Sequence, residues 1–125
     1  MDPTLRITEP LNDSTGFYLD AASRIAEWQT QLHTLEIYDT PHFGRVLRID
    51  GRNFVSEREE FVGHENLVHP ALSAHIAPRR VLVLGGGDGG AVEEILKHPS
   101  VEQVTLCEPD ADLVRIAREH LFAVH

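Results

Sequence analysis

The pattern of hydrophobic and polar positions is least regular at the N-terminus. Proline, asparagine, aspartate, serine and glycine recur in the first sixteen residues, which is typical of irregular chain. Residues 21–31 place Ile25 and Trp28 at the three-residue spacing of one helix face, so a short helix is expected there. Apart from that helix, we expect residues 1–31 to form an irregular N-terminal arm.

Short apolar segments separated by turn residues dominate the next part of the chain. Between Phe43 and Ile49 alternate residues share a face, as a half-buried strand requires. Asp50-Gly51 is typical of a two-residue hairpin turn. These features predict a small antiparallel β-module over residues 32–56. Its expected strands span residues 32–38, 43–49 and 52–56.

The third part, residues 57–125, is expected to open with a linking helix over residues 57–75. Ser56 is placed to cap that helix, with Glu59 as its reciprocal partner in a capping box. Pro70 falls inside the segment, where its ring and its missing N–H favour a break or a kink.

The central pattern of this third part is a strand, a glycine-rich turn, a helix and a second strand. Residues 81–84 are consecutive apolar residues, typical of a strand buried on both faces. Residues 85–90, with the sequence GGGDGG, end that strand. A second buried strand is expected over residues 101–107, and its last residue is Cys107.

The helix expected between these strands, over residues 91–97, is amphipathic. One face carries the apolar side chains: Ala91, Val92, Ile95 and Leu96. The other face carries charged side chains that are expected to contact water: Glu93, Glu94 and Lys97. A further helix is expected after Pro109, because proline suits a first helical turn. The positions that follow its 3.6-residue period are Leu113, Ile116, Ala117, His120 and Leu121.

Gly85, Gly87 and Gly90 have the G-x-G-x-x-G spacing of nucleotide-binding βαβ units. Glu108 follows the second strand, about where such units carry an acid that binds ribose hydroxyls. Glycine is needed where a side chain would block the close approach of a ligand or of the helix. The motif predicts a nucleoside-binding crevice, and a plain strand-to-helix turn is the alternative.

Asp88 lies inside this glycine turn and affects which nucleoside is expected. A diphosphate on the turn would meet its negative charge, and at about 5 Å and an effective dielectric constant near 20 the repulsion is roughly 3 kcal/mol per phosphate charge. Asp88 therefore favours a positively charged nucleoside, such as an adenosyl sulfonium, or an amine beside it. Its alternative role is the N-cap of the helix at 91–97, and one residue can serve both roles.

Composition restricts the partners and the compartment. Lys and Arg number 11 against 20 Asp and Glu, and the formal charge of −9 argues against nucleic acid and anionic membranes but permits a cationic substrate. The single cysteine excludes an internal disulfide framework and fits a reducing cytoplasm. No metal site is expected, because the two histidines of HENLVH (64–69) are one residue too far apart for adjacent helical turns.

His64 has two interpretations. A lone histidine on a helix is most often a surface or half-buried residue. Alternatively, His64 lines the crevice between the β-module and the βαβ unit, where it would take part in binding.

Four segments together resemble one enzyme family: FGRVLRIDG (43–51), SEREEF (56–61), HENLVH (64–69) and VLVLGGGDGGAVEEILKHPSVEQVTLCEPD (81–110). Over about residues 33–121 the chain resembles the N-terminal half of the polyamine aminopropyltransferases, the spermidine synthases. The resemblance implies an α/β architecture, in which a small antiparallel β-module precedes the first βαβα part of a Rossmann-like, methyltransferase-type domain.

The resemblance also implies a reaction and roles for residues. An aminopropyl group would pass from decarboxylated S-adenosylmethionine to putrescine, giving spermidine and methylthioadenosine, with no tightly bound cofactor. His64 and Asp88 would face the polyamine. The nucleoside would lie against the turn at Gly85, Gly86 and Gly87, with its ribose hydroxyls on Glu108, and His33 falls where the family usually has a glutamine that touches it.

The chain departs from the family pattern at three further positions. Phe54 replaces another usual glutamine, and Pro70 comes one place earlier than usual. Gly63 stands where a tyrosine normally precedes the histidine and contacts the amine. The pocket beside His64 is therefore expected to lack an aromatic wall and a hydroxyl, which bears on the choice of amine.

The family's general base is an aspartate in a later D-[ST]-[ST]-D-P segment, which residues 1–125 do not contain. We therefore expect no catalytic base in this chain, and little or no transferase activity from it alone. With only two strands of the sheet, the strand at 81–84 would expose an edge and apolar surface. The alternatives are an S-adenosylmethionine-dependent methyltransferase, or a non-catalytic remnant that pairs its open edge with another chain. A homo-oligomer is implied if the family's full-length arrangement applies.

Overall fold

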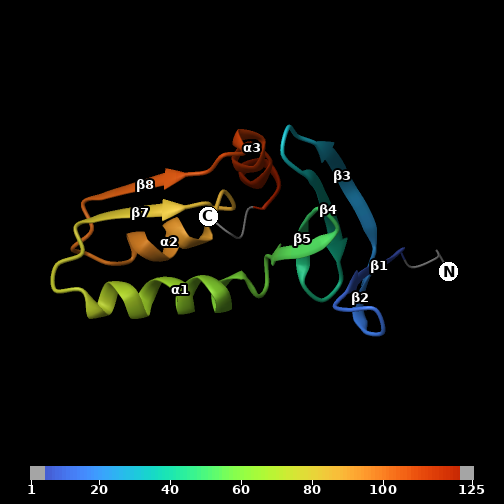
Figure 1. Ribbon diagram of the computed structural model, residues 1–125, viewed down its shortest axis with the longest axis horizontal. Helices are drawn as coiled ribbons and strands as arrows, with labels where there is room; N and C mark the ends of the chain where they lie inside the picture. The colour runs from blue at the N-terminus through green and yellow to red at the C-terminus, as the bar shows by residue number, and fades with distance from the viewer. Residues whose placement is uncertain (1–4, 122–125) are drawn as a thin grey trace. The chain divides into compact units, whose positions relative to one another are not determined.

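The structure is a computed structural model that describes residues 5–121, and it divides into two compact units after Arg58. The N-terminal unit is built from strands alone over its described residues (Figure 1). Its strands are β1 Leu5–Pro10, β2 Gly16–Ala21, β3 Ser23–Gln29, β4 Thr34–Thr40, β5 Gly44–Ile49 and β6 Arg52–Ser56. They form an antiparallel pair, β1-β2, and a four-stranded antiparallel sheet in the order β3-β4-β5-β6.

The irregular arm expected over residues 1–31 is wrong for residues 5–29, which form β1, β2 and β3, and residues 1–4 lie outside the described residues. The short helix expected over residues 21–31 is also wrong, because β3 occupies most of that segment. The turn residues that suggested irregular chain instead close a hairpin. The side-chain oxygen Oδ1 of Asn12 accepts hydrogen bonds from the N–H groups of Ser14 and Thr15, each at 2.9 Å. Pairing of β3 with β4 is a non-local interaction that outweighs the local helical spacing.

The three strands expected over residues 32–56 are present as β4, β5 and β6, but the sheet also includes β3, which lies before the expected bounds of the β-module. The Asp50-Gly51 hairpin turn is confirmed, since φ is +51° at Asp50 and +78° at Gly51, as this type of turn requires. Strand β4 begins at Thr34 rather than at residue 32. The N–H groups of Leu32 and His33 donate to the side-chain oxygen of Thr30 and so belong to the turn before the strand. The core of the sheet consists of Leu35, Ile37, Val46 and Leu47.

The C-terminal unit is the α/β part of the chain. Its elements are α1 Glu60–Ala74, β7 Arg80–Leu84, α2 Gly90–Leu96, β8 Gln103–Cys107 and α3 Ala111–His120. Strands β7 and β8 are parallel neighbours, and α1 and α2 run along the same side of them (Figure 1). The predicted fold class, a β-module followed by a βαβα part of a Rossmann-like domain, is confirmed. Among the described residues, no helix has the length and apolar character needed to cross a membrane.

Helix α1 continues through Pro70, so the expected break is wrong. A proline inside a helix removes one backbone hydrogen bond and costs about 3 kcal/mol. Packing offsets this cost, because Val68 and Leu72 on either side of Pro70 join the core formed with α2 and the strands. The expected Ser56 cap is also wrong, since the N-cap is Glu59 and it makes no side-chain capping bond.

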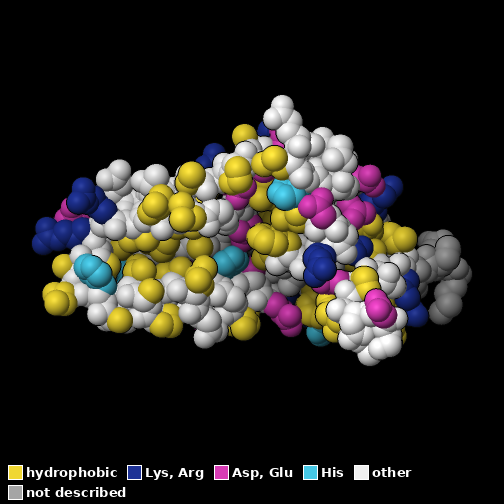
Figure 2. Space-filling model, in the orientation of Figure 1, with side chains coloured by type: hydrophobic (Ala, Val, Ile, Leu, Met, Phe, Trp, Pro, Cys, Tyr) yellow, Lys and Arg dark blue, Asp and Glu magenta, His cyan; other side chains and the backbone are white. Residues whose placement is uncertain are grey.

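The two strands are buried on one face only. Val81, Val83 and Val104 pack against α1 and α2, whereas Leu82 and Leu84 are 60% and 77% exposed. Cys107 is exposed as well, although a buried position was expected. Figure 2 shows hydrophobic side chains gathered over the part of the surface formed by α1 and β7. The expectation of exposed apolar surface is therefore confirmed, and burial on both faces is wrong for residues 81–84.

Two expectations for α2 are corrected. Its N-cap is Gly89, with φ +88° and no side-chain capping bond, so Asp88 is not the cap. Glu94, expected to contact water, is 2% exposed because it pairs with side chains of α1 and of the end of α2. In α3 the expected apolar positions are buried, and Asp110 caps the helix by accepting from the N–H groups of two following residues.

Candidate functional site

The candidate site begins with the glycine turn between β7 and α2. Gly85 and Gly86 have φ of +77° and +74°, a conformation that side chains other than hydrogen disfavour. The N–H of Gly85 donates to the carbonyl of Cys107 at 2.9 Å, which fastens the start of the turn to the end of β8. The turn therefore lies at the carboxyl ends of two adjacent parallel strands, where α/β folds place ligands.

Glu108 follows β8 and is held in a fixed orientation beside the turn. Its Oε2 accepts from the N–H of Gly87 at 3.1 Å, and its Oε1 accepts from the N–H of Asp110 at 3.0 Å. Each carboxylate oxygen keeps acceptor capacity for a ligand hydroxyl. A Cβ at Gly87 would lie 2.8 Å from Cγ of Glu108, so glycine is required for this contact.

His64 lies between two carboxylates. Its Nδ1 is 2.5 Å from Oε2 of Glu60, one turn earlier on α1, and its Nε2 is 2.9 Å from Oδ2 of Asp88 in the glycine turn. The side chains of Glu60, His64 and Asp88 are 9%, 16% and 2% exposed. We call these three residues the acidic histidine cluster.

The charge of His64 follows from its neighbours. The Asp88 carboxylate, opposed by burial and assisted by Glu60, raises the pKa of His64 to about 9. Although the distance is that of an ion pair, the ring N–H is not aligned with Asp88, whose Oδ2 has no hydrogen bond among the described residues. We therefore treat the contact as a charge–charge interaction that leaves this oxygen able to accept from a ligand.

Gly90 has a role that its place in the motif did not reveal. A Cβ there would overlap the imidazole ring of His64, so this glycine makes room for a side chain from α1. The spacing of the motif had suggested only close approach of a ligand or of the helix to the sheet. In the structure, the last glycine of the motif admits the ring that contacts Asp88.

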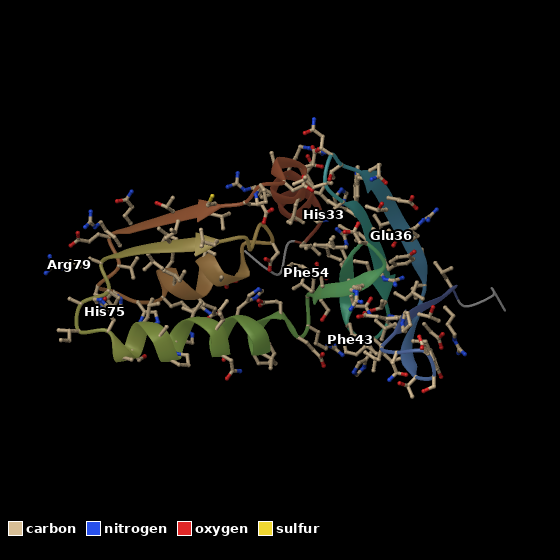
Figure 3. All side chains as sticks on the ribbon, in the orientation of Figure 1. His33, Glu36, Phe43, Phe54, His75 and Arg79 are labelled. Atoms are coloured by element: carbon tan, nitrogen blue, oxygen red, sulfur yellow. The ribbon has the colours of Figure 1, made fainter. Side chains whose placement is uncertain are left out.

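The C-terminal unit brings together most of the residues predicted for the site. His64 meets Asp88, and Gly87 meets Glu108, all at the carboxyl ends of β7 and β8. His33, which is labelled in Figure 3, belongs to the N-terminal unit and lies in the turn between β3 and β4. Its Nδ1 is 2.7 Å from Oδ2 of Asp50.

A second histidine cluster lies further along α1 and was missed by the sequence patterns. Nε2 of His69 is 2.7 Å from Oε2 of Glu94, and Nδ1 of His69 is 2.9 Å from Nε2 of His98. The ammonium of Lys97 pairs with Oε1 of Glu94 at 2.5 Å and, with His69, holds the pKa of Glu94 below its usual value. We call these four residues the balanced histidine cluster. Only the packing of α1 on α2 brings them together.

The model of the spermine/spermidine synthase domain family matches residues 60–125 of this chain. The chain belongs to this family. The match includes both histidine clusters, the glycine turn and Glu108. The resemblance found in the motifs is therefore confirmed.

Family members of known structure or curated function are similar over nearly the whole chain. Polyamine aminopropyltransferases from Nitrosomonas europaea and Thermoanaerobacter pseudethanolicus are each 44% identical over 94% of this chain, which covers 36% and 42% of their lengths. Spermidine synthase from Thermotoga maritima superposes with a TM-score of 0.93 and 35% identity, over 96% of this chain and 42% of that one. A spermidine synthase in complex with the transition-state analogue AdoDATO gives the same TM-score and identity. The chain spans about two fifths of the length of the relatives it matches.

Proposed function

We propose that this chain carries the nucleoside-binding and amine-binding half of an aminopropyltransferase. The proposed reaction transfers the aminopropyl group of decarboxylated S-adenosylmethionine to putrescine and yields spermidine and methylthioadenosine. The observation that carries the proposal is the carboxylate of Asp88, buried inside the glycine turn beside His64. The names of the similar aminopropyltransferases and spermidine synthases support it.

In this proposal the nucleoside lies on the glycine turn with its ribose on Glu108. A carboxylate accepts hydrogen bonds from both hydroxyls of a ribose, and the two backbone N–H groups that hold Glu108 set its direction in advance. The turn is uncrowded at Gly85, where no atom lies within 4 Å of the position of a Cβ. This leaves space for a ligand against the backbone.

The polyamine would bind at the acidic histidine cluster. Alkylamines have a pKa near that of lysine, about 10, so putrescine arrives as a dication at neutral pH. The cluster carries two carboxylates and one imidazolium, and its net charge is therefore negative. Burial of Asp88 strengthens its attraction for an ammonium, because solvent screens a buried charge less.

The reaction also requires a general base, which the described residues do not supply at this site. The nitrogen lone pair of the amine attacks the carbon bonded to the sulfonium, the carbon–sulfur bond breaks towards sulfur, and the amine proton passes to a base. The resemblance places that base on an aspartate in a later segment of the family. We therefore propose that residues 1–125 bind the reactants but transfer the aminopropyl group slowly or not at all.

Calorimetry with the purified chain tests the binding half of this proposal. Decarboxylated S-adenosylmethionine should bind more tightly than S-adenosylmethionine, by roughly tenfold or more, because the latter brings a carboxylate towards Asp88. Equal or tighter binding of S-adenosylmethionine would instead favour a methyltransferase. A coupled assay that detects spermidine at an ordinary enzymatic rate would contradict the expected inactivity.

The exposed side of β7 supports a second candidate function, an interaction module. Leu82 and Leu84 are exposed, and a hollow of about 550 Å³ lies beside Leu82, between the end of α1 and the start of β7. His75 and Arg79 mark its position in Figure 3. Gel filtration separates the candidates: a stable monomer that binds the nucleoside counts against edge pairing, whereas a homo-oligomer without ligand supports it.

A further inference from the structure

Glu60 has no role in the motifs, yet it makes the shortest contact to His64. The two residues are four apart on α1, so their side chains lie on the same face of the helix. Oε2 of Glu60 lies 2.5 Å from Nδ1 of His64, and the Glu60 side chain is 9% exposed. The opposite ring nitrogen faces Asp88 at 2.9 Å.

The geometry favours one protonation state of the ring. An ionised carboxylate can only accept hydrogen bonds, so Nδ1 must present its N–H to Glu60 at 2.5 Å. At Nε2, 2.9 Å from Asp88, an N–H is favoured by charge over a lone pair, although it is not aligned for a hydrogen bond. A neutral imidazole has an N–H on one nitrogen only, and its other lone pair would face a carboxylate lone pair. His64 is therefore an imidazolium in the ligand-free protein, in agreement with its pKa of about 9.

The charged groups around the ring are few. Glu60 contributes from α1 and Asp88 from the glycine turn, and both favour the proton on His64. Helix α2 approaches the ring through Gly90, which has no side chain. With one cation between two carboxylates, the cluster has a net charge of −1, and one Asp88 oxygen has no aligned donor among the described residues.

We infer that His64 is a resident cation that gives up its Nε2 proton when a primary ammonium binds to Asp88, and that Glu60 is the positioning residue that makes this exchange possible. This inference rests on the proposed amine-binding function. The proton passes to solvent, and the imidazolium becomes a neutral imidazole. Glu60 keeps the Nδ1–H, so the lone pair appears on Nε2, where it accepts a hydrogen bond from the ammonium.

The reason for the exchange is repulsion between two cations. An ammonium at about 5 Å from the ring, at an effective dielectric constant near 20, lowers the proton affinity of the ring on the order of 100-fold. That change takes an imidazole that is almost fully protonated at neutral pH to one of which about half is neutral. Amine binding should therefore strengthen as the pH rises from 7 towards 9.

Nuclear magnetic resonance of the ring protons tests the inference on the intact chain. The His64 resonance is assigned by its absence in His64→Gln and titrated without ligand, with putrescine and with the uncharged diol of the same length. We expect a pKa near 9 without ligand and with the diol. With putrescine, we expect a fall in proton affinity on the order of 100-fold. Glu60→Gln should lower the pKa of His64 in the ligand-free protein and allow the neutral ring to carry its proton on Nε2. Fewer protons should then be released for each putrescine that binds.

Glu65→Gln is the matched control, because it removes the same charge from an exposed position of α1. It should leave both the His64 titration and its response to putrescine unchanged. If putrescine shifts the backbone resonances of the glycine turn but leaves His64 protonated, the proton exchange is wrong and the amine site stands. If putrescine shifts no resonance at all, the amine-binding function fails, and the inference fails with it. An ordinary histidine pKa without ligand would also overturn the inference.

Discussion

The two histidine clusters on α1 are built from similar residues but differ in charge. In the acidic histidine cluster, His64 lies between Glu60 and Asp88 and the sum is −1. In the balanced histidine cluster, Glu94 pairs with Lys97, and His69 and His98 face each other. A buried carboxylate that no fixed cation neutralises is stabilised by a cation from a ligand. A carboxylate that is already paired with a lysine does not need one.

In the proposed function, this difference distinguishes the cluster that binds a ligand from the cluster that supports the fold. The acidic histidine cluster has a buried carboxylate oxygen without an aligned donor among the described residues, which suits a site that a cation completes. The balanced histidine cluster satisfies Glu94 on both oxygens and fastens α1 to α2. A histidine near a carboxylate is therefore not a sufficient sign of function. What distinguishes the two clusters is whether a fixed cation already neutralises the carboxylate.

The largest expected effect comes from Gly90→Ala, which disrupts the acidic histidine cluster. The new methyl group would overlap the His64 ring, so the ring must leave its position between the carboxylates. Overpacking together with the loss of a buried charge pair should reduce the free energy of unfolding by about 2–3 kcal/mol and abolish measurable putrescine binding. Urea unfolding followed by far-ultraviolet circular dichroism measures the free energy of unfolding. The helical signal reports on the C-terminal unit, because all the described helices belong to it.

Gly63→Ala serves as the control for this substitution, since it adds the same methyl group to α1 with no atom within 4 Å of it. It should leave the helix at least as stable as before. A Gly90→Ala protein with unchanged stability and unchanged putrescine affinity would show that the ring does not occupy the position described.

Glu94→Gln should have a smaller effect, and on stability alone. The substitution leaves the ammonium of Lys97 and the ring of His69 without a charged acceptor, which should lower the free energy of unfolding by about 1–2 kcal/mol. Putrescine affinity should stay within roughly twofold, because the acidic histidine cluster is untouched. Urea unfolding and calorimetry on the same sample give both numbers.

Glu93→Gln is the matched control on α2, because its buried Oε2 has no hydrogen bond among the described residues. Neutralising it should cost little. A loss of putrescine affinity in Glu94→Gln of tenfold or more would mean that the two clusters act as one site.

The sequence predicts best what depends on neighbours along the chain. The Asp50-Gly51 turn, the strand and glycine turn before α2, and the position of Glu108 all follow from short motifs. The N-terminal strands did not follow, since residues 21–31 have a helical spacing, whereas residues 23–29 form a strand by pairing with residues 34–39. The spacing of apolar residues along one segment does not show which other segment will pair with it.

The candidate site shows the same division. Asp88 could be proposed as a binding residue from its charge inside a glycine turn, which is a local property. Glu60 and Glu94 could not, because each is defined by a contact between helices, and Glu94 was expected to contact water. The four-residue spacing of Glu60 and His64 was the available signal for the acidic histidine cluster.

The two clusters should also respond to pH in opposite directions. The folded protein raises the pKa of His64 from 6.5 to about 9, so its contribution to stability is complete below pH 6.5 and is lost as the pH rises to 9. The pKa of Glu94 is lowered from 4.5, so its contribution is present above that pH and is lost as the pH falls below it.

Urea midpoints measured from about pH 3 to about pH 10 test this contrast, because that range extends past both transitions. The midpoint difference between the unsubstituted chain and His64→Gln should shrink on the alkaline side. The difference between the unsubstituted chain and Glu94→Gln should shrink on the acid side. Parallel curves for the two variants would contradict the separate protonation states assigned to the clusters.

The smallest effect is expected from Gly63→Tyr, which sharpens the comparison at the acidic histidine cluster. The resemblance places an aromatic residue before the histidine, and the position of a Cβ at Gly63 has no atom within 4 Å, so the side chain can be accommodated. An aromatic ring beside a bound ammonium contributes about 0.5–1 kcal/mol, so putrescine affinity should rise roughly twofold to fivefold. Gly63→Phe separates the ring from the hydroxyl, and Gly63→Ala removes the gain in helix propensity from the comparison. If Gly63→Ala raises the affinity as much as Gly63→Tyr, helix stability rather than an aromatic contact limits amine binding at His64.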